Sequence, residues 1–345
     1  MNQPVELRKT NRGGMLLRSV AARIGEFKYL YSLLRITRSG LRKQPDFPAL
    51  VELQTVNRCN ASCPMCPYPD TIAKQQLSYL SDQNYEEILQ QLLREPEFQM
   101  LVLTFQNEPL LDKQLVNRAR RFKELMPDKH LEIVTNGVLL TPDRVEQLYQ
   151  WFDLISISIN AHSPETHASV MGMNNFQSLK EKLEFIATNP KWVDKTVLRF
   201  IRQEKNSHER RDFGRYWRKH GFRVFSFEIN SRLDKVNNYH KVRTLRTRFG
   251  RSLLLLFKPL AHLLLPHCTI PDLTSYIRAN GDVVLCFNDY SEDNLLGSIN
   301  DSSIREIFNA DHTVAIRKRV RCNQVEDGEI CKKCDLYKEG IWLTF

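Results

Sequence analysis

Two patterns of apolar and polar positions alternate along residues 50–232 of the chain. Short apolar runs are typical of strands: VELQTV, QMLVLTF, HLEIVT, DLISISI, TVLRFI and RVFSFEI. Between them lie stretches with apolar residues at helical spacing, such as DQNYEEILQQLLRE, TPDRVEQLYQWF and SLKEKLEFIATN. Repeated βα units of this size predict an α/β fold, a parallel sheet or barrel with helices outside. The six units are fewer than the eight of a closed barrel.

The first 49 residues follow a different pattern. In MLLRSVAARIGEFKYLYSLLRI, Leu17, Val20 and Ile24 recur at helical spacing, with Arg18 and Arg23 interleaved. This pattern predicts a basic amphipathic helix. It ends near SGLRKQPDFP, where glycine and prolines break helices. We therefore expect residues 1–49 to form an N-terminal extension, separate from the α/β region at 50–232.

The alternation stops after residue 232. A basic, leucine-rich link is expected at 233–266, followed by a small cysteine-rich α+β domain at 267–345. In that domain, TSYIRANGDVVLC predicts a hairpin that turns at Asn280-Gly281, and SSIREIFN predicts a short helix. The apolar run LLLLFKPLAHLLL is too short and too interrupted to span a membrane.

Positive charge is concentrated in two blocks. The 345 residues have a formal net charge of +10, and residues 1–50 contain ten lysines and arginines against three acids. A second basic block runs from Lys241 to Lys258. Such blocks bind phosphate, nucleic acid or an anionic membrane surface, or are simply solvated faces. No secretory signal is visible, so we expect a cytoplasmic location, where clustered cysteines bind metal or serve catalysis.

Cys59, Cys63 and Cys66 follow the first expected strand with the spacing C-x3-C-x2-C. Active sites of barrels and open parallel sheets form at the carboxyl ends of strands. A structural zinc site takes four ligands, and the next histidine and cysteine are as far away as His130 and Cys268. Three thiolates better suit an iron–sulfur cube, which four cysteines normally hold. One iron would then stay open to a small molecule.

This motif, at the end of the first of six βα units, resembles the signature of the radical S-adenosylmethionine (SAM) superfamily. FQNEPLL after the second strand resembles the family's Gly-Gly-Glu-Pro segment, with Gln106 and Asn107 at the glycine positions, and TNG follows the third strand. The resemblance implies a partial (βα)6 TIM-like barrel and a [4Fe-4S] cluster whose free iron is chelated by SAM. Reduction of the cluster cleaves SAM, and the resulting 5′-deoxyadenosyl radical abstracts hydrogen from a C–H bond.

The resemblance also implies SAM-binding roles for residues at the strand ends. Asn107 and Glu108 would bind the SAM ammonium group, and the backbone of Met65 would contact adenine. Candidates for the ribose and carboxylate are Ser158, Asn160, Arg199 and Gln203. Each polar residue of this set is equally at home as an ordinary interior or loop residue with partners inside the protein.

A set of four cysteines lies further along the chain: Cys268, Cys286, Cys331 and Cys334. A hairpin followed by a C-x2-C knuckle can bring four thiolates around one metal, which suits zinc as well as iron–sulfur. Beside the first motif it resembles the shortened SPASM domain, called a twitch domain, which carries one auxiliary [4Fe-4S] cluster. The segments RANGDVVLCFND and LLGSINDSSIREIF also resemble that domain.

Cys322 is the remaining cysteine, and three roles are open for it. It is a free thiol that behaves as a small apolar residue, or it replaces one ligand of the auxiliary cluster. By the resemblance to epimerases of the superfamily, it would instead be a catalytic residue that donates a hydrogen atom to a substrate radical.

The resemblance predicts a radical SAM oxidoreductase and leaves the substrate open. We expect dehydrogenation or epimerisation of a sugar or aminocyclitol, with peptide or protein modification, by crosslinking or maturation, as the alternative. A reductant such as flavodoxin or ferredoxin would supply the electron, and the basic N-terminal helix would contact an anionic membrane surface. Two non-catalytic alternatives are a zinc or iron–sulfur protein that binds nucleic acid and a scaffold that holds clusters without SAM chemistry. The βα repeat and the incomplete cysteine set argue against a nucleic-acid partner.

Overall fold

A computed structural model of the chain describes residues 45–236, 268–290, 294–335 and 337. The basic helix expected near the N-terminus and almost all of the link expected at 233–266 lie outside these ranges. Within them, nine strands form one sheet with the order β6-β5-β4-β3-β2-β1-β7-β8-β9. No helix in the described ranges is long and apolar enough to cross a membrane.

Six consecutive strands form the parallel part of the sheet. They are β1 (Leu50–Leu53), β2 (Met100–Val102), β3 (His130–Thr135), β4 (Leu154–Ser158), β5 (Thr196–Arg202) and β6 (Arg223–Glu228). Each strand pairs in parallel with the next along the chain. The six strands expected from the sequence are confirmed. Among the described residues β6 has no neighbour on its other side, so the barrel is partial.

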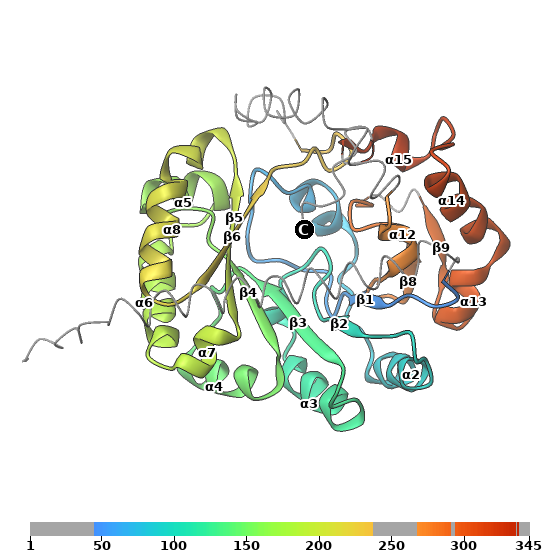
Figure 1. Ribbon diagram of the computed structural model, residues 1–345, viewed down its shortest axis with the longest axis horizontal. Helices are drawn as coiled ribbons and strands as arrows, with labels where there is room; N and C mark the ends of the chain where they lie inside the picture. Colours follow the sequence, from blue (N-terminus) through green and yellow to red (C-terminus); the bar gives the residue numbers. More distant parts are fainter. Residues whose placement is uncertain (1–44, 237–267, 291–293, 336, 338–345) are drawn as a thin grey trace, which may run out of the picture. The chain divides into compact units, whose positions relative to one another are not determined.

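Helices connect these strands and lie on the outer side of the row of strands (Figure 1). They are α2 (Asp82–Leu93), α3 (Leu115–Leu125), α4 (Pro142–Trp151), α5 (Pro164–Met171), α6 (Phe176–Ala187), α7 (Pro190–Asp194) and α8 (Arg210–Lys219). Short 3-10 helices are η1 (Tyr68–Asp70), η2 (Ile72–Lys74), η3 (Pro109–Leu111) and η4 (Glu204–Glu209). The hydroxyls of Ser81, Thr141 and Ser163 accept backbone N–H groups and so define where α2, α4 and α5 begin.

Alternate strand residues face opposite sides of the sheet. The helix-facing side is an apolar core, with Leu53, Leu101, Ile133, Ile157 and Leu198 fully buried. The other side, which we call the barrel interior, carries polar groups between these positions, namely Glu52, Glu132, Ser156 and Arg199. A purely structural barrel would not need charges there, so the interior is where a polar ligand is expected.

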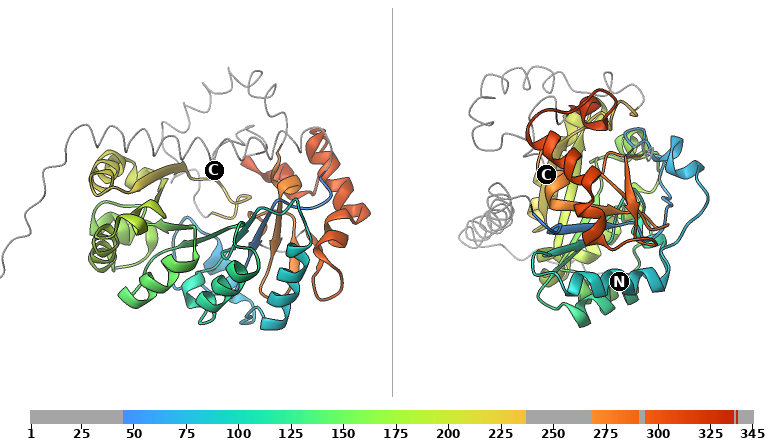
Figure 2. Two further views of the ribbon diagram at one scale, coloured as in Figure 1. Left: turned by 60° about the horizontal axis from the view of Figure 1, so that its bottom comes forward. Right: turned by 90° about the vertical axis from the view of Figure 1, so that its right-hand side faces the viewer.

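The C-terminal region continues the same sheet. β7 (Thr274–Ile277) pairs in parallel with β1, and β8 (Asp282–Val284) and β9 (Leu295–Ser298) follow in antiparallel order. The helices of this region are α12 (Ile270–Leu273), α13 (Ile304–Asn309), α14 (Asp311–Arg321) and α15 (Ile330–Lys333). The expected hairpin at Asn280-Gly281 and the expected helix at SSIREIFN are confirmed. Figure 2 shows the orange C-terminal strands beside the blue β1.

Two glutamines join the barrel to this C-terminal region. Gln54, after β1, donates to the carbonyl of Phe105 at 3.0 Å and accepts from the backbone N–H of Ala279 at 3.2 Å. Gln106, in a left-handed conformation with φ 54°, donates to the carbonyl of Phe287 at 2.9 Å. The C-terminal region is therefore bonded to the loops that follow β1 and β2, where the first cysteine motif also lies.

Candidate active site

Cys59, Cys63 and Cys66 lie in the loop between β1 and η1, at the carboxyl end of β1. The N–H of Cys66 donates to the carbonyl of Cys63 at 2.9 Å, which makes a tight turn within the motif. The N–H of Cys59 donates to the hydroxyl of Tyr68 at 2.9 Å. The loop is thus held by its own backbone and by the first side chain of η1, while all three cysteines keep partial exposure.

The three thiols are near enough to act on one another's charge. Burial, with smaller contributions from Glu108 and Cys66, raises the pKa of Cys59 to about 12. Burial, then Cys66 and Cys59, raises the pKa of the Cys63 thiol far above its ordinary value. Metal ligands are thiolates, so these half-buried sulfurs need a compensating positive charge. Iron supplies that charge, and the donor set therefore fits an iron–sulfur cluster.

The number of cysteines in the motif fits a cluster with one open iron better than a structural zinc ion, which takes four ligands. Among the described residues, no three histidine, cysteine or acidic side chains converge on a position that one ion could occupy. A zinc ion needs its sulfur ligands at about 2.3 Å. In a [4Fe-4S] cube each cysteine binds a different iron, so the sulfurs need not converge on one point.

Glu108, after β2, ties the cysteine loop to the end of β3. Its buried carboxylate accepts hydrogen bonds from the hydroxyl of Thr135 at 2.6 Å and from the N–H groups of Asn136 at 2.8 Å and Leu110 at 3.1 Å. Its backbone N–H donates to the carbonyl of Arg58 at 2.8 Å. Burial outweighs these hydrogen bonds and raises the pKa of Glu108 to about 7. With three acceptor positions in use, the carboxylate has room for about one further donor, such as an ammonium group.

Neighbouring amides complete this corner of the site. Asn136 of the TNG segment donates to the side-chain oxygen of Asn60 at 2.7 Å, which links the end of β3 directly to the cysteine loop. Asn107 accepts from the N–H of Phe105 at 2.8 Å, and its buried side-chain nitrogen lacks a partner among the described residues. The segments after β1, β2 and β3 are therefore one bonded unit, with an unused donor on Asn107.

Ser158 and Asn160 lie at and just beyond the end of β4. The Ser158 hydroxyl is half-buried and makes no hydrogen bond within the described ranges. Asn160 is fully buried and left-handed, with φ 59°, and its side-chain oxygen accepts from the N–H of Ile201 at 2.6 Å. Its side-chain nitrogen contacts the sulfur of Met171 at 3.0 Å. Ser158 is thus available to a ligand, whereas Asn160 is already occupied in joining β4 to β5.

Met65 and Gln203, expected to contact SAM from different parts of the chain, meet in the structure. The Gln203 side-chain nitrogen lies 3.0 Å from the Met65 sulfur, and both residues are buried. Gln203 follows β5 directly, so this contact joins the end of β5 to the cysteine loop. The carboxyl ends of β1 and β5 are therefore parts of one site.

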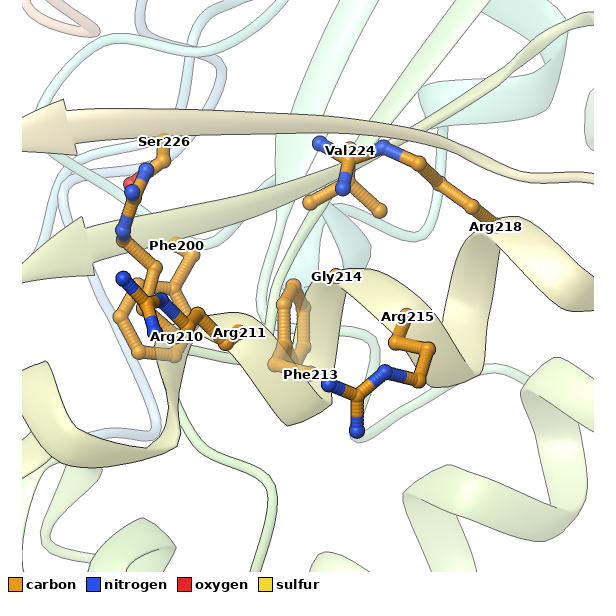
Figure 3. A pocket seen from close by; sticks show the side chains of 9 residues that line it. All are labelled: Phe200, Arg210, Arg211, Phe213, Gly214, Arg215, Arg218, Val224 and Ser226. Carbon is orange, nitrogen blue, oxygen red and sulfur yellow. The ribbon is translucent and has the colours of Figure 1, made fainter.

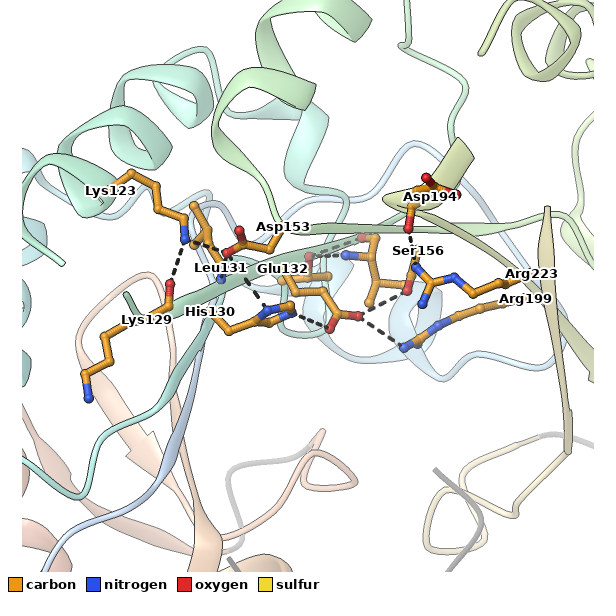
Figure 4. Close-up of polar contacts among 12 residues, drawn as sticks. Lys123, Lys129, His130, Leu131, Glu132, Asp153, Ser156, Asp194, Arg199 and Arg223 are labelled. Carbon is orange, nitrogen blue, oxygen red and sulfur yellow. Dashed lines mark hydrogen bonds and ion pairs between the residues drawn. The ribbon is translucent and has the colours of Figure 1, made fainter. Parts of the chain in front are cut away.

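Arg199 of β5 points into the barrel interior, as alternation along the strand predicts (Figure 4). Its guanidinium lies 3.7 Å from the carboxylate of Glu132 and over the ring of Phe227 at 5.5 Å. Glu132 also accepts from the hydroxyl of Ser156 at 3.1 Å. Glu132 was not among the residues expected at the site, although a charged residue in the middle of the strand HLEIVT was a signal for it in the sequence.

Glu52 of β1 is a second interior carboxylate that the sequence analysis did not name. Burial raises its pKa to about 8, with Arg199 and Arg232 opposing and Glu132 reinforcing the shift. Glu52 forms no hydrogen bond or ion pair with any residue that the structure describes. Its strand neighbour is Tyr276 of β7. The signal in the sequence was again one acid inside a strand, VELQTV.

The four later cysteines gather around the end of β8 and the helices α12 and α15. Burial raises the pKa values of Cys268 and Cys286 well above the ordinary range, and the other thiols of this group add to the shift in both. Burial and Cys334 raise the pKa of Cys331 to about 12. Mutually interacting thiols, with Cys334 buried and the other three half-buried, fit a metal cluster for the same reason as the first three do.

Cys322 stands apart from both groups. It is exposed, at the C-terminal end of α14, and it does not contribute to the raised pKa values of the other cysteines. An exposed position at the end of a helix is typical of a free surface thiol. Its proposed function as a hydrogen-atom donor stays a prediction.

Tyr290 connects the two cysteine groups. Its hydroxyl lies 3.8 Å from the sulfur of Cys66, and the residue is four positions after Cys286. The ring is buried with Tyr68 and Ile72 against Cys59 and Cys66. The phenol of Tyr290, which belongs to the region with the second cysteine group, therefore faces the Cys66 sulfur of the first motif.

Comparison with known proteins agrees with this arrangement. A model of the radical SAM superfamily matches residues 53–231, and a SPASM model, an iron–sulfur cluster-binding domain, matches residues 268–335. The S-adenosyl-L-methionine-dependent 2-deoxy-scyllo-inosamine dehydrogenase of Niallia circulans is 20% identical over 288 residues, which are 83% of this chain and 92% of that protein.

Solved structures share the fold. BtrN in complex with AdoMet and 2-DOIA has a TM-score of 0.58 at 18% identity, over 84% of this chain and 93% of that chain. Streptococcus suis SuiB bound to the precursor peptide SuiA has a TM-score of 0.63 at 13% identity, over 97% of this chain and 77% of that chain. Because the first family model spans more than half of the sequence, the chain belongs to the radical SAM superfamily and carries a C-terminal SPASM-type iron–sulfur domain.

Proposed function

We propose that this radical SAM oxidoreductase dehydrogenates a hydroxyl-bearing carbon of a sugar- or aminocyclitol-type small molecule. Its cofactors are SAM, a [4Fe-4S] cluster and an auxiliary iron–sulfur cluster. When bound and reduced, the first cluster would cleave SAM to methionine and a 5′-deoxyadenosyl radical, which would take a hydrogen atom from the hydroxyl-bearing carbon. The hydroxyl proton would leave to solvent and the remaining electron would pass to the auxiliary cluster, which gives the ketone. The remaining steps of the proposal concern what the side chains of this chain do.

We assign Cys59, Cys63 and Cys66 to the SAM-binding cluster. The set of four, assigned to the auxiliary cluster, is Cys268, Cys286, Cys331 and Cys334. The support is that the thiols within each group raise one another's pKa, so each group is brought together by the fold. The first group leaves one iron without a protein ligand, and the second does not.

The SAM contacts are assigned to the carboxyl ends of the strands around the first group. Glu108 and Asn107 would bind the SAM ammonium and carboxylate region through the free acceptor position of Glu108 and the unused donor of Asn107. Ser158 offers a free hydroxyl, and Gln203 lies beside Met65 near the expected place of adenine. Asn160 would act by positioning β5 rather than by direct contact, because its side chain is already bonded.

The observation that carries the substrate class is the polar barrel interior. Glu52 is a half-buried carboxylate that forms no hydrogen bond or ion pair with the residues that the structure describes, and Arg199 pairs among those residues with Glu132. Burying such groups is costly unless they are hydrogen-bonded. A ligand with several hydroxyl groups, or with an amine for Glu52, would supply the missing partners. An apolar substrate would not.

The match to most of the length of a dehydrogenase supports the same class. The name of the Niallia circulans relative places its activity on an aminocyclitol, and 92% of that protein aligns with this chain.

The test is an anaerobic assay of the reconstituted full-length enzyme with SAM and dithionite. Aminocyclitols such as 2-deoxy-scyllo-inosamine, free sugars and neighbouring-gene peptides are added separately. We expect 5′-deoxyadenosine and a ketone product, at one equivalent each, with a member of the first two groups. A peptide that alone stimulates 5′-deoxyadenosine formation would establish peptide modification instead. No 5′-deoxyadenosine from enzyme with both clusters intact would overturn the enzymatic function.

Two partners complete the proposal. A low-potential electron carrier, flavodoxin or ferredoxin, would reduce the SAM-binding cluster in a reducing cytoplasm. The basic extension at 1–49, with its local excess of positive charge, would contact an anionic membrane surface. Removal of residues 1–44 should abolish binding to anionic liposomes; unchanged binding would contradict this function of the extension.

A further inference from the structure

A hollow lies between α8 and the last two strands of the parallel sheet (Figure 3). Its volume is about 290 Å³, and its floor is apolar, formed by Phe200, Phe213 and Val224. Four arginines of α8 surround it: Arg210, Arg211, Arg215 and Arg218. A cavity with this much positive charge over an apolar floor is not needed to pack a helix on a sheet.

The hollow is separate from the barrel interior. Val224 and Ser226 of β6 line it, whereas Phe227 of the same strand lies against Arg199 in the interior. Since successive strand residues face opposite sides, β6 stands between the two spaces. A ligand of this hollow is therefore not the molecule that reacts in the barrel.

Little opposes the positive charge around the hollow. Asp212 of α8 pairs with Arg215 at 2.8 Å, and Figure 3 shows Arg215 directed away from the strands. The guanidinium groups of Arg210, Arg211 and Arg218 make no hydrogen bond or ion pair with the residues that the structure describes. Like charges held near one another repel, so an anion in the hollow would relieve that repulsion.

Gly214 leaves space in the hollow because it has no side chain. It lies in the middle of α8, where glycine is a poor helix former, and it is buried at the wall of the hollow. A Cβ atom on Gly214 would lie 2.7 Å from a guanidinium nitrogen of Arg218. The missing side chain therefore lets the Arg218 guanidinium rest over the helix backbone at the hollow.

We propose that this arginine pocket, formed by Arg210, Arg211, Gly214, Arg218 and Ser226, binds the phosphate or pyrophosphate group of a phosphorylated ligand. Guanidinium groups match phosphate oxygens with two parallel hydrogen bonds each, and such charge-assisted bonds are the strong ones. The Ser226 hydroxyl can donate a further bond. The apolar floor strengthens these contacts by lowering the local dielectric.

The size of the pocket sets the extent of the ligand it holds. Small-molecule sites have volumes of about 300–1,000 Å³, so this pocket is at the lower limit. It has room for the phosphate-bearing end of a ligand, with the rest of the ligand outside. The phosphate could belong to a soluble nucleoside diphosphate or to a lipid headgroup, and the experiment separates these two sources.

The primary test is calorimetric titration of the reconstituted full-length enzyme with sodium pyrophosphate at constant ionic strength. We expect saturable binding at one site, weakened about tenfold or more by Arg211→Gln and by Arg218→Gln. Gly214→Ala should also weaken binding, because its methyl group displaces Arg218. The same variant should keep or raise the melting temperature, because alanine is the better helix former.

Lys219→Gln is the matched control, since it removes one positive charge from the same helix outside the pocket. We expect its affinity for pyrophosphate to stay within about twofold of the wild type, as distant exposed charges are screened. Tighter binding of UDP than of pyrophosphate would identify a nucleotide source. Binding to phosphatidic acid vesicles that pyrophosphate displaces would identify a lipid source.

Three results would overturn the proposal. The first is the absence of saturable pyrophosphate binding to the wild type. The second is an equal loss of affinity in Lys219→Gln and Arg218→Gln, which would indicate diffuse attraction by the whole helix. The third is an unchanged pyrophosphate affinity in both Arg211→Gln and Arg218→Gln, which would place the bound anion elsewhere on the enzyme.

Discussion

Glu52 is a half-buried side chain and Tyr290 a buried one, and both lie beside the site. Glu52 faces the barrel interior with no partner in the described ranges, and Tyr290 faces the sulfur of Cys66. The surroundings of Glu52 set the pKa of its carboxyl group. The phenol of Tyr290 affects the electron density on the Cys66 thiolate. Each can be tested without knowing the substrate.

Replacing Glu52 with glutamine is expected to change how stability depends on pH. Burial raises the pKa of Glu52 from 4.5 to about 8. Between these values the folded protein keeps the proton that the unfolded chain has released. The stability contributed by Glu52 is therefore complete below about pH 4.5 and is lost as the pH rises to about 8. Anaerobic melts should show the melting temperature of Glu52→Gln rising relative to wild type from pH 5 to pH 8.

Glu86→Gln is the control for that series. The pKa of Glu86 is lowered to about 2, mainly by its hydrogen bonds with Arg121. A lowered pKa gives stability that is present above the ordinary value of 4.5 and is lost only as the pH falls toward 2. The difference between Glu86→Gln and wild type should be constant from pH 5 to pH 8. A constant difference for Glu52→Gln as well would contradict the raised pKa of Glu52.

Tyr290→Phe is expected to lower the reduction potential of the SAM-binding cluster. With Cys66 as a thiolate ligand, the phenol donates a hydrogen bond to it, which favours the more negative reduced state. A hydrogen bond worth about 1 kcal/mol corresponds to a shift on the order of 40 mV for one electron. A redox titration followed by electron paramagnetic resonance measures this shift.

Tyr68→Phe is the matched control for Tyr290→Phe. Tyr68 packs in the same cluster, but its hydroxyl accepts from the backbone N–H of Cys59 and contacts no sulfur. We expect its potential to stay close to that of the wild type. Equal potentials for wild type and Tyr290→Phe would show that the phenol does not bond to the ligated thiolate.

Helix α5 and the cysteine loop meet at Gly172, so a helix end limits the position of the loop. Gly172 ends α5 in the left-handed region, with φ 66°. A Cβ atom there would lie 2.6 Å from the carbonyl oxygen of Ser62, between Cys59 and Cys63. The backbone of the motif therefore packs directly against the end of a helix about 110 residues later in the chain.

Gly172→Ala is expected to lower the unfolding free energy by about 1–3 kcal/mol and to reduce the iron bound at the first motif. The added methyl group must push the Ser62 carbonyl, and with it the cysteine loop, out of place. Iron content and melting temperature measure the two effects. Gly221→Ala, with φ 92° and Val193 as its nearest contact at 3.3 Å, is the control. It should lower stability but keep full iron content; iron loss in both variants would contradict a local effect at the loop.

At the scale of the whole molecule, the barrel and the C-terminal region share one sheet. β1 lies between β2 and β7, so its pairing on one side comes from the C-terminal region. Tyr276 of β7 packs on Phe105 after β2, with ring centroids 5.2 Å apart. The cluster-binding region is thus a structural neighbour of the barrel as well as a carrier of its own cysteines.

Truncation after residue 236 is therefore expected to prevent folding of the barrel. It would leave β1 unpaired on one side, and an unpaired strand edge favours aggregation. We expect insoluble protein, or soluble protein without a cooperative melt by circular dichroism. A soluble, cooperatively melting fragment would contradict this dependence.

The control is a full-length variant in which the four auxiliary cysteines are replaced by alanine. This variant keeps the sheet and removes only the cluster ligands. This variant should stay soluble, with its iron content falling from about eight to about four per chain. Insolubility of this variant too would show that the cluster, and not the shared sheet, supports the barrel.

The sequence by itself determined the six parallel strands, the hairpin at Asn280-Gly281 and the two cysteine groups. These depend on local patterns: apolar periodicity over a few residues, glycine at a tight turn and thiol spacing within a loop. The family resemblance rested on the same local motifs and is confirmed by the matching family models. Helix α5, which begins in a polar stretch, had a weaker pattern and was not singled out.

The tertiary structure alone decided which polar groups face one another. Glu132 with Arg199, and Cys66 with Tyr290, are contacts between residues 67 and 224 positions apart. The pairing of β7 with β1, which places the C-terminal region beside the cysteine loop, is equally remote in sequence. Such contacts depend on the order and register of strands across the whole sheet. A short stretch of sequence does not contain the order and register of distant strands. The free energy of each contact is gained only after the chain between its two partners has folded.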